Sequence, residues 1–418
     1  MNIKVKTIYW FLLIYCLFYC INPLLFGNNV RLINSLIILL VLFVSLLRNN
    51  LKKDDFSYLF LFLIYSAYIL IQTLGSNLIT STFSVFKFYI IYPSVVLIGA
   101  TASFLFVNEA EKEQELIWKI LWGWGVLLLL LAVYELITSD YVVKMANMEK
   151  ALYSYSGGRT LGLIRARVFS SSYLTLGDIF GMLSITSLFL FVKFKNKMYL
   201  FFTYAFFAGV FFASSRGSIV GTAVAFLMLY IIRDNKNFGK INKKHIKWIV
   251  LTFSLVFFVF MLGKNNEVIN YWIKRVTTIF DWTSKAESND VRLEHWMTYL
   301  KLWTATPRNF FIGTGGLTAG YESLLGVTES GFIEHLVEVG LVGSILYYSL
   351  MLIPFIRFLK RKTFTHFGKW ILACFTILFV HDFVLQVSVS DDICLLMWLL
   401  VMLMYIENYR IEFIEKRE

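Results

Sequence analysis

Residues 116–137, LIWKILWGWGVLLLLLAVYELI, decide the fold class of this chain. Only Lys119 and Glu135 are charged in this run of 22 residues. A helix of about 20 predominantly apolar residues is long enough to cross the hydrocarbon core of a bilayer. The runs 8–26 and 83–107 also reach that length. The chain is therefore predicted to cross a membrane several times.

The composition of the whole chain supports this prediction. Of its 418 residues, 58% are apolar and 16% are charged, and the mean hydropathy is +0.68. An average soluble domain is about half apolar and a quarter charged. A soluble protein this apolar could not cover its own surface with polar groups. We exclude a soluble enzyme, a disordered regulator and a nucleic-acid-binding protein, and predict an all-α polytopic membrane protein.

Apolar length and charged breaks predict about twelve transmembrane helices in a single membrane domain, 1–418. With the N-terminus in the cytoplasm, the inward segments hold 23 Lys and Arg residues, whereas the short outward loops hold only Arg31 and Arg216. Short cytoplasmic loops are enriched in these residues, so both termini are predicted to be cytoplasmic. This topology also accounts for most of the net charge of +12. The predicted spans are 7–26, 32–47, 56–74, 83–107, 116–138, 170–192, 198–213, 217–232, 248–263, 331–356, 370–388 and 392–407.

The first apolar run is predicted to be a retained span rather than a cleaved signal peptide. Lys4 and Lys6 precede it, but the following NPLLF (22–26) offers no small-residue cleavage site. The cysteines lie in apolar runs and form neither a CxxC pair nor a cluster with metal-ligand spacing. We therefore expect neither a metal nor another cofactor. The four cysteines are Cys16, Cys20, Cys374 and Cys394.

Two outward segments, 139–168 and 264–330, are long, and long loops tend to carry function. In the second segment apolar residues recur at helical spacing, after which Pro307 follows. This pattern predicts an amphipathic helix that could lie along the outer membrane interface. The recurring residues are Leu293, Trp296, Met297, Leu300 and Trp303.

Arginines are the first candidates for chemistry in the outward segments. Arg216 lies in a Ser-Ser-Arg-Gly turn, 214–217, between two predicted spans. Its guanidinium group could clamp a phosphate or diphosphate, because its fork of donors suits bidentate oxygen contacts. It could equally extend to the lipid headgroups. Arg159, Arg165 and Arg167 precede another span and Arg292 opens the predicted outer helix; converging, they would suit a lipid-linked diphosphate, and the alternative is a solvated charged loop.

Acidic residues near the end of the second long segment are the other candidates. Glu329 ends the loop, and Glu334, His335 and Glu338 follow at a spacing that places the two glutamates on one helical face. One carboxylate could be a general base for a sugar hydroxyl, or the stretch could be a polar, water-facing helix start. Four further ionisable residues within predicted spans suit either a proton-coupled transporter or structural ion pairs, such as Lys87 with Glu135 or Asp178. They are Lys87, Asp178, His381 and Asp382.

Four motifs of the chain resemble, in order, those of the O-antigen polymerase and O-antigen ligase superfamily of bacterial inner membranes. The first is the arginine-bearing stretch Arg165-Ala-Arg-Val-Phe-Ser, and the second is the turn 214–217. The third is Arg292-Leu-Glu-His-Trp296, followed by Gly313-Thr-Gly315. The fourth is Glu329-Ser-Gly-Phe with Glu338-Val-Gly340-Leu-Val-Gly343. The motifs cover about 160–345, and the rest of the chain matches by span count.

The resemblance implies a metal-independent, largely helical membrane glycosyltransferase of C-type architecture that uses polyprenyl diphosphate-linked sugars at the outer leaflet. Arg216 and Arg292 would hold the donor diphosphate, assisted by Arg165 or Arg167, because cations stabilise charge that builds on a leaving diphosphate. Glu329 would be the catalytic residue that activates the acceptor hydroxyl. Many ligases have a His-Asn pair where this chain has Glu329-Ser330, which favours a repeat-unit polymerase.

The expected function is the polymerisation of lipid-linked repeats into O-antigen, capsule or exopolysaccharide, with His335 and Glu338 as substrate-binding residues. Expected partners are a polyprenyl diphosphate-linked donor and acceptor and membrane lipids; they could include a chain-length regulator and a flippase, and no nucleic acid is expected. A ligase that transfers finished glycan to a lipid core or a protein is an alternative. A transporter of lipid-linked sugars is another, which predicts inverted repeats and broken helices near the midplane; the sequence shows neither clearly.

Overall fold

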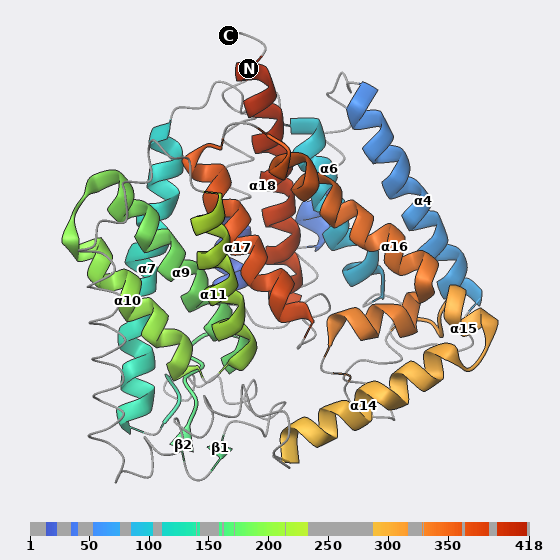
Figure 1. Ribbon diagram of the computed structural model, residues 1–418, viewed down its shortest axis with the longest axis horizontal. Helices are drawn as coiled ribbons and strands as arrows, with labels where there is room; N and C mark the ends of the chain where they lie inside the picture. The colour runs from blue at the N-terminus through green and yellow to red at the C-terminus, as the bar shows by residue number, and fades with distance from the viewer. Residues whose placement is uncertain are drawn as a thin grey trace. The chain divides into compact units, whose positions relative to one another are not determined.

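The computed structural model shows α-helices and one short β-hairpin in the part of the chain that it describes (Figure 1). By contacts the chain divides into two compact units. The first unit comprises Met1–Gln114 and Asp290–Glu418, and the second comprises Glu115–Asn289. The described residues are 14–22, 35–40, 53–75, 85–102, 111–138, 140–142, 159–160, 163–170, 172–213, 215–232, 287–316, 328, 330–361, 364–383 and 391–415.

The prediction of a helical membrane protein is confirmed at the level of its helices. Among the described residues, five helices are long and apolar enough to cross a membrane, and three more apolar helices are shorter. The number of twelve spans stays a prediction, since the predicted span 248–263 lies outside the described residues. The five long candidates are Phe56–Leu74, Gln114–Thr138, Tyr173–Phe194, Gly331–Leu359 and Ile393–Glu412.

The second unit is built around one buried helix. This is α9 (Tyr173–Phe194), which packs most extensively on α10 (Lys197–Phe212) and also contacts α11 (Arg216–Ile231). The side chains of Ser184 and Ser187 donate to backbone carbonyls of α10, at 2.8 and 2.6 Å. Such small polar residues allow apolar helices to pack closely.

The remaining elements of the second unit are α7 (Glu111–Thr138) and a hairpin of β1 (Arg159–Thr160) and β2 (Leu163–Ile164). Near the start of α7, Glu115 forms an ion pair with Lys193 in the last turn of α9, at 2.5 Å. A carboxylate at a helix start and a cation at a helix end each complement the helix dipole. This pair therefore fixes one end of α7 to α9.

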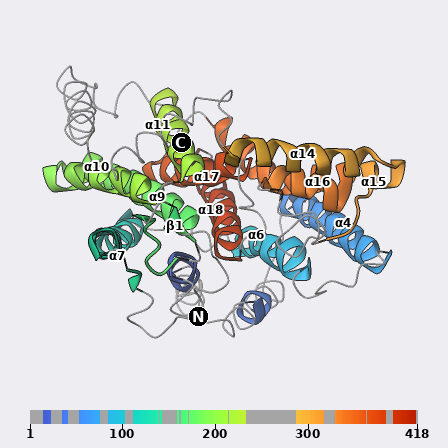
Figure 2. The same ribbon diagram turned by 90° about the horizontal axis from the view of Figure 1, so that it is seen from below.

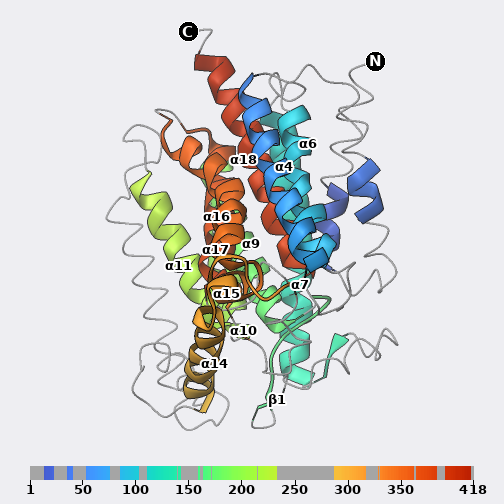
Figure 3. The same cartoon turned by 90° about the vertical axis from the view of Figure 1, so that its right-hand side faces the viewer.

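The first unit is centred on α18 (Asp391–Glu415), which contacts α6 (Tyr92–Ala102), α17 (His366–Asp382) and α16 (Gly331–Leu359). Figure 3 shows α18 running beside α6, and the Tyr58 ring of α4 (Lys53–Gly75) lies 5.4 Å from the Tyr405 ring of α18. A short π-helix, η1 (Lys87–Ile91), leads directly into α6. A π-turn is an uncommon element that is frequent at functional sites.

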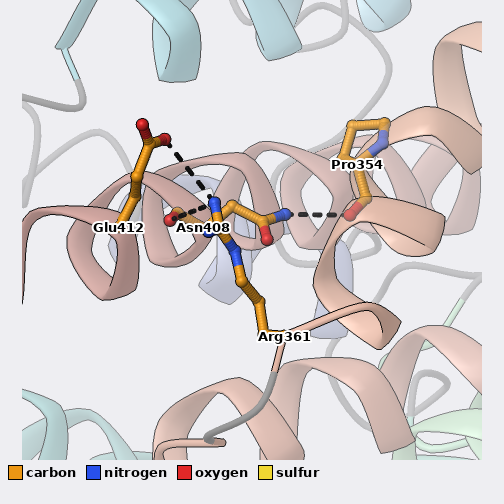
Figure 4. A network of polar contacts seen from close by, with 4 residues as sticks. All are labelled: Pro354, Arg361, Asn408 and Glu412. Carbon is orange, nitrogen blue, oxygen red and sulfur yellow. Dashed lines mark hydrogen bonds and ion pairs between the residues drawn. The ribbon is translucent and has the colours of Figure 1, made fainter. Parts of the chain in front are cut away.

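A proline inside α16 explains one contact with a neighbouring helix, and its own carbonyl makes another. Pro354 lacks an N–H group, so the carbonyl of Leu350 loses its helical donor. The hydroxyl of Tyr58 on α4 donates to this carbonyl. On the other side, the Asn408 amide of α18 donates to the Pro354 carbonyl at 2.8 Å, and Arg361 bonds the Asn408 carbonyl and Glu412 (Figure 4).

The helix predicted in the second long outward segment is present as α14 (Glu287–Thr304), followed by α15 (Pro307–Phe311). Its buried face agrees with the predicted one in part, since Trp296 and Trp303 pack against a buried cluster. Tyr299 is fully buried and packs with Ile333 and Val337 of α16, whereas Leu293 and Met297 are exposed. Figures 1 and 2 show α14 beside the first segment of α16, before the break at Gly340. The buried face of α14 is therefore centred on Tyr299, which is not one of the residues of the predicted apolar face.

Candidate functional site

The arginine-bearing stretch before α9 is held by a buried carboxylate of α7. Glu135 is fully buried and accepts three backbone N–H groups: that of Arg167 at 2.7 Å, that of Val168 at 3.0 Å and that of Val142 at 2.9 Å. The N–H of Ala166 also donates to Phe212 at the end of α10, at 3.2 Å. This network fixes the path of residues 165–168.

The same stretch contains a strained residue. Val168 has a φ of +52°, in the left-handed region that β-branched residues rarely adopt. A left-handed conformation costs roughly 1–2 kcal/mol for a residue other than glycine. The two hydrogen bonds between the Val168 N–H and the Glu135 carboxylate, at 3.1 and 3.0 Å, offset this cost.

Both arginines of the stretch are buried, each with 6% exposure. The guanidinium carbon of Arg165 lies 4.5 Å from the ring centroid of Tyr173, a cation–π arrangement. Arg167 donates through Nε to the Ser170 carbonyl at 3.1 Å. The alternative prediction, a solvated charged loop, is therefore wrong for Arg167. The side chain of Arg159 lies outside the described residues.

Arg216 lies at the same end of the second unit as this stretch. It is the first residue of α11 and is half-buried, after Ser215, which caps the helix. The hydrogen bond from Ala166 to Phe212 places the arginine-bearing stretch beside Phe212. Phe212 precedes Arg216 by four residues along the chain. The first turns of α9 and α11 also touch, because Ser218 Oγ donates to the Leu174 carbonyl at 3.3 Å.

Two helix N-termini and three arginines thus gather at one end of the second unit. The start of a helix carries a partial positive charge and N–H groups without intrahelical partners, so it favours anions. A Cβ at Gly177 would lie 2.8 Å from Ser215 Cβ and Ser218 Oγ, so glycine is needed for α9 to approach α11 this closely. The electrostatics of this end suit a multiply charged anion such as a phosphate or diphosphate.

In the first unit, the candidate acidic residues lie on a broken helix. Gly340 interrupts α16 with φ +67° and ψ −176°, a conformation essentially limited to glycine. Figure 1 shows the ribbon of α16 changing direction sharply. The carbonyls before the break lose their helical donors, because the N–H groups four residues later have turned away.

The Gly313-Thr314-Gly315 turn satisfies these carbonyls. The N–H groups of Thr314 and Gly315 donate to Val337 and Glu338 at 2.8 and 3.0 Å. From α4, the Tyr68 hydroxyl donates to Val339 at 2.8 Å, and the Gln72 amide donates to Glu338. A Cβ at Gly313, which has a φ of +87°, would overlap the Glu338 carbonyl. The glycine turn of the third motif therefore contacts the Glu-x-Gly of the fourth.

The helical segment before the break carries three ionisable residues that are fully buried: Glu334, His335 and Glu338. The alternative prediction, a polar, water-facing helix start, is therefore wrong for this stretch. The hydroxyl of Tyr89, on η1, donates to Glu338 Oε2 at 2.5 Å and lies 3.4 Å from His335 Nδ1. A carboxylate, a phenol and an imidazole within hydrogen-bond reach can accept and pass on a proton.

Aromatic side chains surround this group. The Tyr347 ring lies edge-on to His335, with centroids 4.1 Å apart, and Tyr348 is 5.7 Å from the same imidazole. The Tyr348 hydroxyl donates to Asp382 on α17 at 3.4 Å. Burial among apolar rings strengthens the electrostatic interactions within the group.

Some of the other candidate residues are buried, and others lie outside the described residues. Lys87, Asp178, His381 and Asp382 are all buried, and the Lys87 ammonium group lies 4.3 Å from the Phe88 ring centroid. Arg292 lies on α14, but its side chain lies outside the described residues, as does Glu329. Ser330, next to Glu329, caps α16 and is 2% exposed.

Sequence reasoning missed the residues that hold both groups in place. Glu135 was considered only as an ion-pair partner of Lys87, whereas it binds backbone N–H groups. Its one signal in the sequence is a carboxylate near the end of an apolar run, which is energetically costly unless it is solvated or paired. Tyr89 has no signal of its own, because its partners lie more than 240 residues away along the chain.

Comparison of the chain with known protein families and with curated proteins finds no match.

Proposed function

We propose that this protein polymerises polyprenyl diphosphate-linked oligosaccharide repeats at the outer leaflet of a bacterial cytoplasmic membrane. In this proposal about twelve helices cross the membrane, both termini are cytoplasmic, and the arginine-rich end of the second unit faces outward. Products of this class are O-antigen, capsule and exopolysaccharide.

One observation carries the proposal: Arg165, Arg167 and Arg216 belong to backbone segments that meet at one end of the second unit, beside the starts of α9 and α11. The leaving group of the reaction is a polyprenyl diphosphate. Its negative charge increases as the sugar–oxygen bond breaks, and positive groups fixed in advance stabilise that charge.

In the proposed reaction the C1–O bond between the donor sugar and its diphosphate breaks, and a hydroxyl of the acceptor repeat forms the new glycosidic bond. A carboxylate takes the proton of that hydroxyl. Following the family resemblance, we assign this base to Glu329 and a further diphosphate contact to Arg292. His335 and Glu338 are assigned to substrate binding.

The break in α16 raises a second candidate, a transporter of lipid-linked sugars. Transporters commonly use broken helices, whose open carbonyls bind ions or substrate. In this protein the carbonyls of Val337, Glu338 and Val339 already accept hydrogen bonds from Thr314, Gly315 and the side chains of α4. The break therefore favours a rigid joint over an ion-binding site, and the polymerase remains the better-supported function.

The proposal is tested by replacing the arginines in the native host. Arg216→Ala and the double variant Arg165→Ala/Arg167→Ala should abolish the ladder of long polysaccharide chains on a gel, at unchanged protein levels. Lys197→Ala is the matched control, since it removes an exposed cation of the same unit. Full-length ladders in both arginine variants would exclude the assigned role.

A further inference from the structure

We infer that Glu135 is a positioning residue that holds the diphosphate-binding stretch in its binding conformation; this inference rests on the function proposed above. In this role the carboxylate contacts the stretch and not the diphosphate. It lies beneath the stretch, fully buried at the end of α7, and bonds the backbone rather than the guanidinium groups.

The geometry of the carboxylate is specific for this task. Oε1 accepts from Val142 and Val168, and Oε2 accepts from Arg167 and Val168. Four hydrogen bonds to three backbone N–H groups use the acceptor capacity of an ionised carboxylate, which has about four lone-pair sites. An amide in its place would direct an NH₂ group at N–H donors. The site therefore requires the charged oxygen pair and not merely a polar side chain.

The strain at Val168 connects this contact to Arg165 and Arg167. With φ at +52°, Val168 lies in the turn that follows Arg167, in which the Ser170 N–H donates to the Arg167 carbonyl at 3.1 Å. Without both carboxylate oxygens, a β-branched residue would return to an extended or right-handed conformation. Rotation of that peptide would displace the Arg167 backbone and alter the turn in which Arg167 Nε donates to the Ser170 carbonyl.

Simple electrostatics makes the opposite prediction, which gives the inference a clear test. The Glu135 charge acts on Arg167, and removing a negative charge near an anion site should strengthen the binding of diphosphate. If Glu135 positions the arginines, its loss should instead weaken that binding. The sign of the change in affinity therefore separates positioning from a plain charge effect.

The measurement is the affinity of the full-length protein in lipid nanodiscs for a short-chain prenyl diphosphate, by isothermal titration. Glu135→Gln should weaken binding at least tenfold. The second change Val168→Gly should restore most of that loss, because glycine adopts positive φ at little steric cost. Glu115→Gln is the matched control, since it removes a carboxylate from the other end of the same helix, and it should leave the affinity unchanged.

Each outcome has a defined consequence. If the unaltered protein binds the prenyl diphosphate and Glu135→Gln binds it as tightly or more tightly, the positioning role is overturned and the proposed function stays intact. Absence of binding by the unaltered protein would overturn the diphosphate site and this inference together. If Glu135→Gln does not fold, Glu135→Asp replaces it, since this change keeps the charge but withdraws it by one methylene group. Glu135→Asp should weaken binding about threefold, and an affinity equal to that of the unaltered protein would also overturn the role.

Discussion

The joint between the two halves of α16 allows a stability prediction worked from the structure. Gly340→Ala places a Cβ 2.5 Å from the carbonyl carbon and oxygen of Phe311 and 2.6 Å from the amide nitrogen of Gly313. These are backbone atoms, which cannot rotate aside. The φ of +67° at this position is also unfavourable for alanine.

Two contributions set the magnitude. A residue other than glycine in this region of backbone conformation costs about 1–3 kcal/mol. Displacing the glycine turn breaks the hydrogen bonds from Thr314 and Gly315, each worth about 1 kcal/mol. We expect a loss of about 3–5 kcal/mol in the free energy of unfolding, equivalent to a fall of about 3–6 °C in the unfolding temperature of a chain of this length.

The assay is thermal unfolding of the purified protein in detergent micelles, followed by size-exclusion chromatography of the fraction that remains folded. Gly123→Ala on α7 is the control, because a Cβ there has no atom within 4 Å. Alanine at this exposed helical position should stabilise the protein by up to about 1 kcal/mol. An unfolding temperature for Gly340→Ala within 2 °C of the unaltered protein would refute the assigned geometry of the joint.

Two further predictions concern buried hydroxyl groups. Tyr58→Phe should lower the free energy of unfolding by about 1–3 kcal/mol, because it leaves the Leu350 carbonyl, which Pro354 deprives of its helical donor, without a hydrogen bond. Adding Pro354→Ala should recover part of this loss, as measured by chemical denaturation. Strictly additive effects of the two changes would argue against the coupling. Tyr89→Phe should destabilise by about 1.5–3 kcal/mol by removing a hydrogen bond to the Glu338 carboxylate. Tyr347→Phe should change stability by less than 1 kcal/mol, because its hydroxyl has no hydrogen bond within the described residues. Equal unfolding temperatures for the Tyr89 and Tyr347 variants would contradict the assigned contact.

The helices themselves could be predicted from the sequence because apolar length is a local property. The run 116–137 and the helix α7 coincide closely, and the Pro307 signal falls at the start of α15. The prediction of a helix in the second long outward segment was also correct. Its buried face was predicted in part: it includes Trp296 and Trp303. Tyr299 was missed, because its packing partner is a distant helix that spacing along α14 does not reveal.

The supports of the candidate site could not be predicted in the same way. Gly313 and Gly340 belong to two of the predicted motifs. Only the fold shows that the backbone of each leaves no room for a Cβ at the other. The contact from Glu135 to residues 167–168 joins segments more than 30 residues apart through backbone N–H groups, which leave no trace in residue type. The positive φ of Val168 runs against its own preference, so local reasoning would have excluded it.

Activity of the purified protein provides the most direct measurement of the proposed polymerase. The protein is reconstituted in liposomes with polyprenyl diphosphate-linked repeats of a single kind, without an ion gradient. We expect chains of many repeats, with one polyprenyl diphosphate released for every new glycosidic bond, and no product from Arg216→Ala. Repeats that cross the bilayer but stay unjoined would be incompatible with a polymerase and would identify the protein as a transporter.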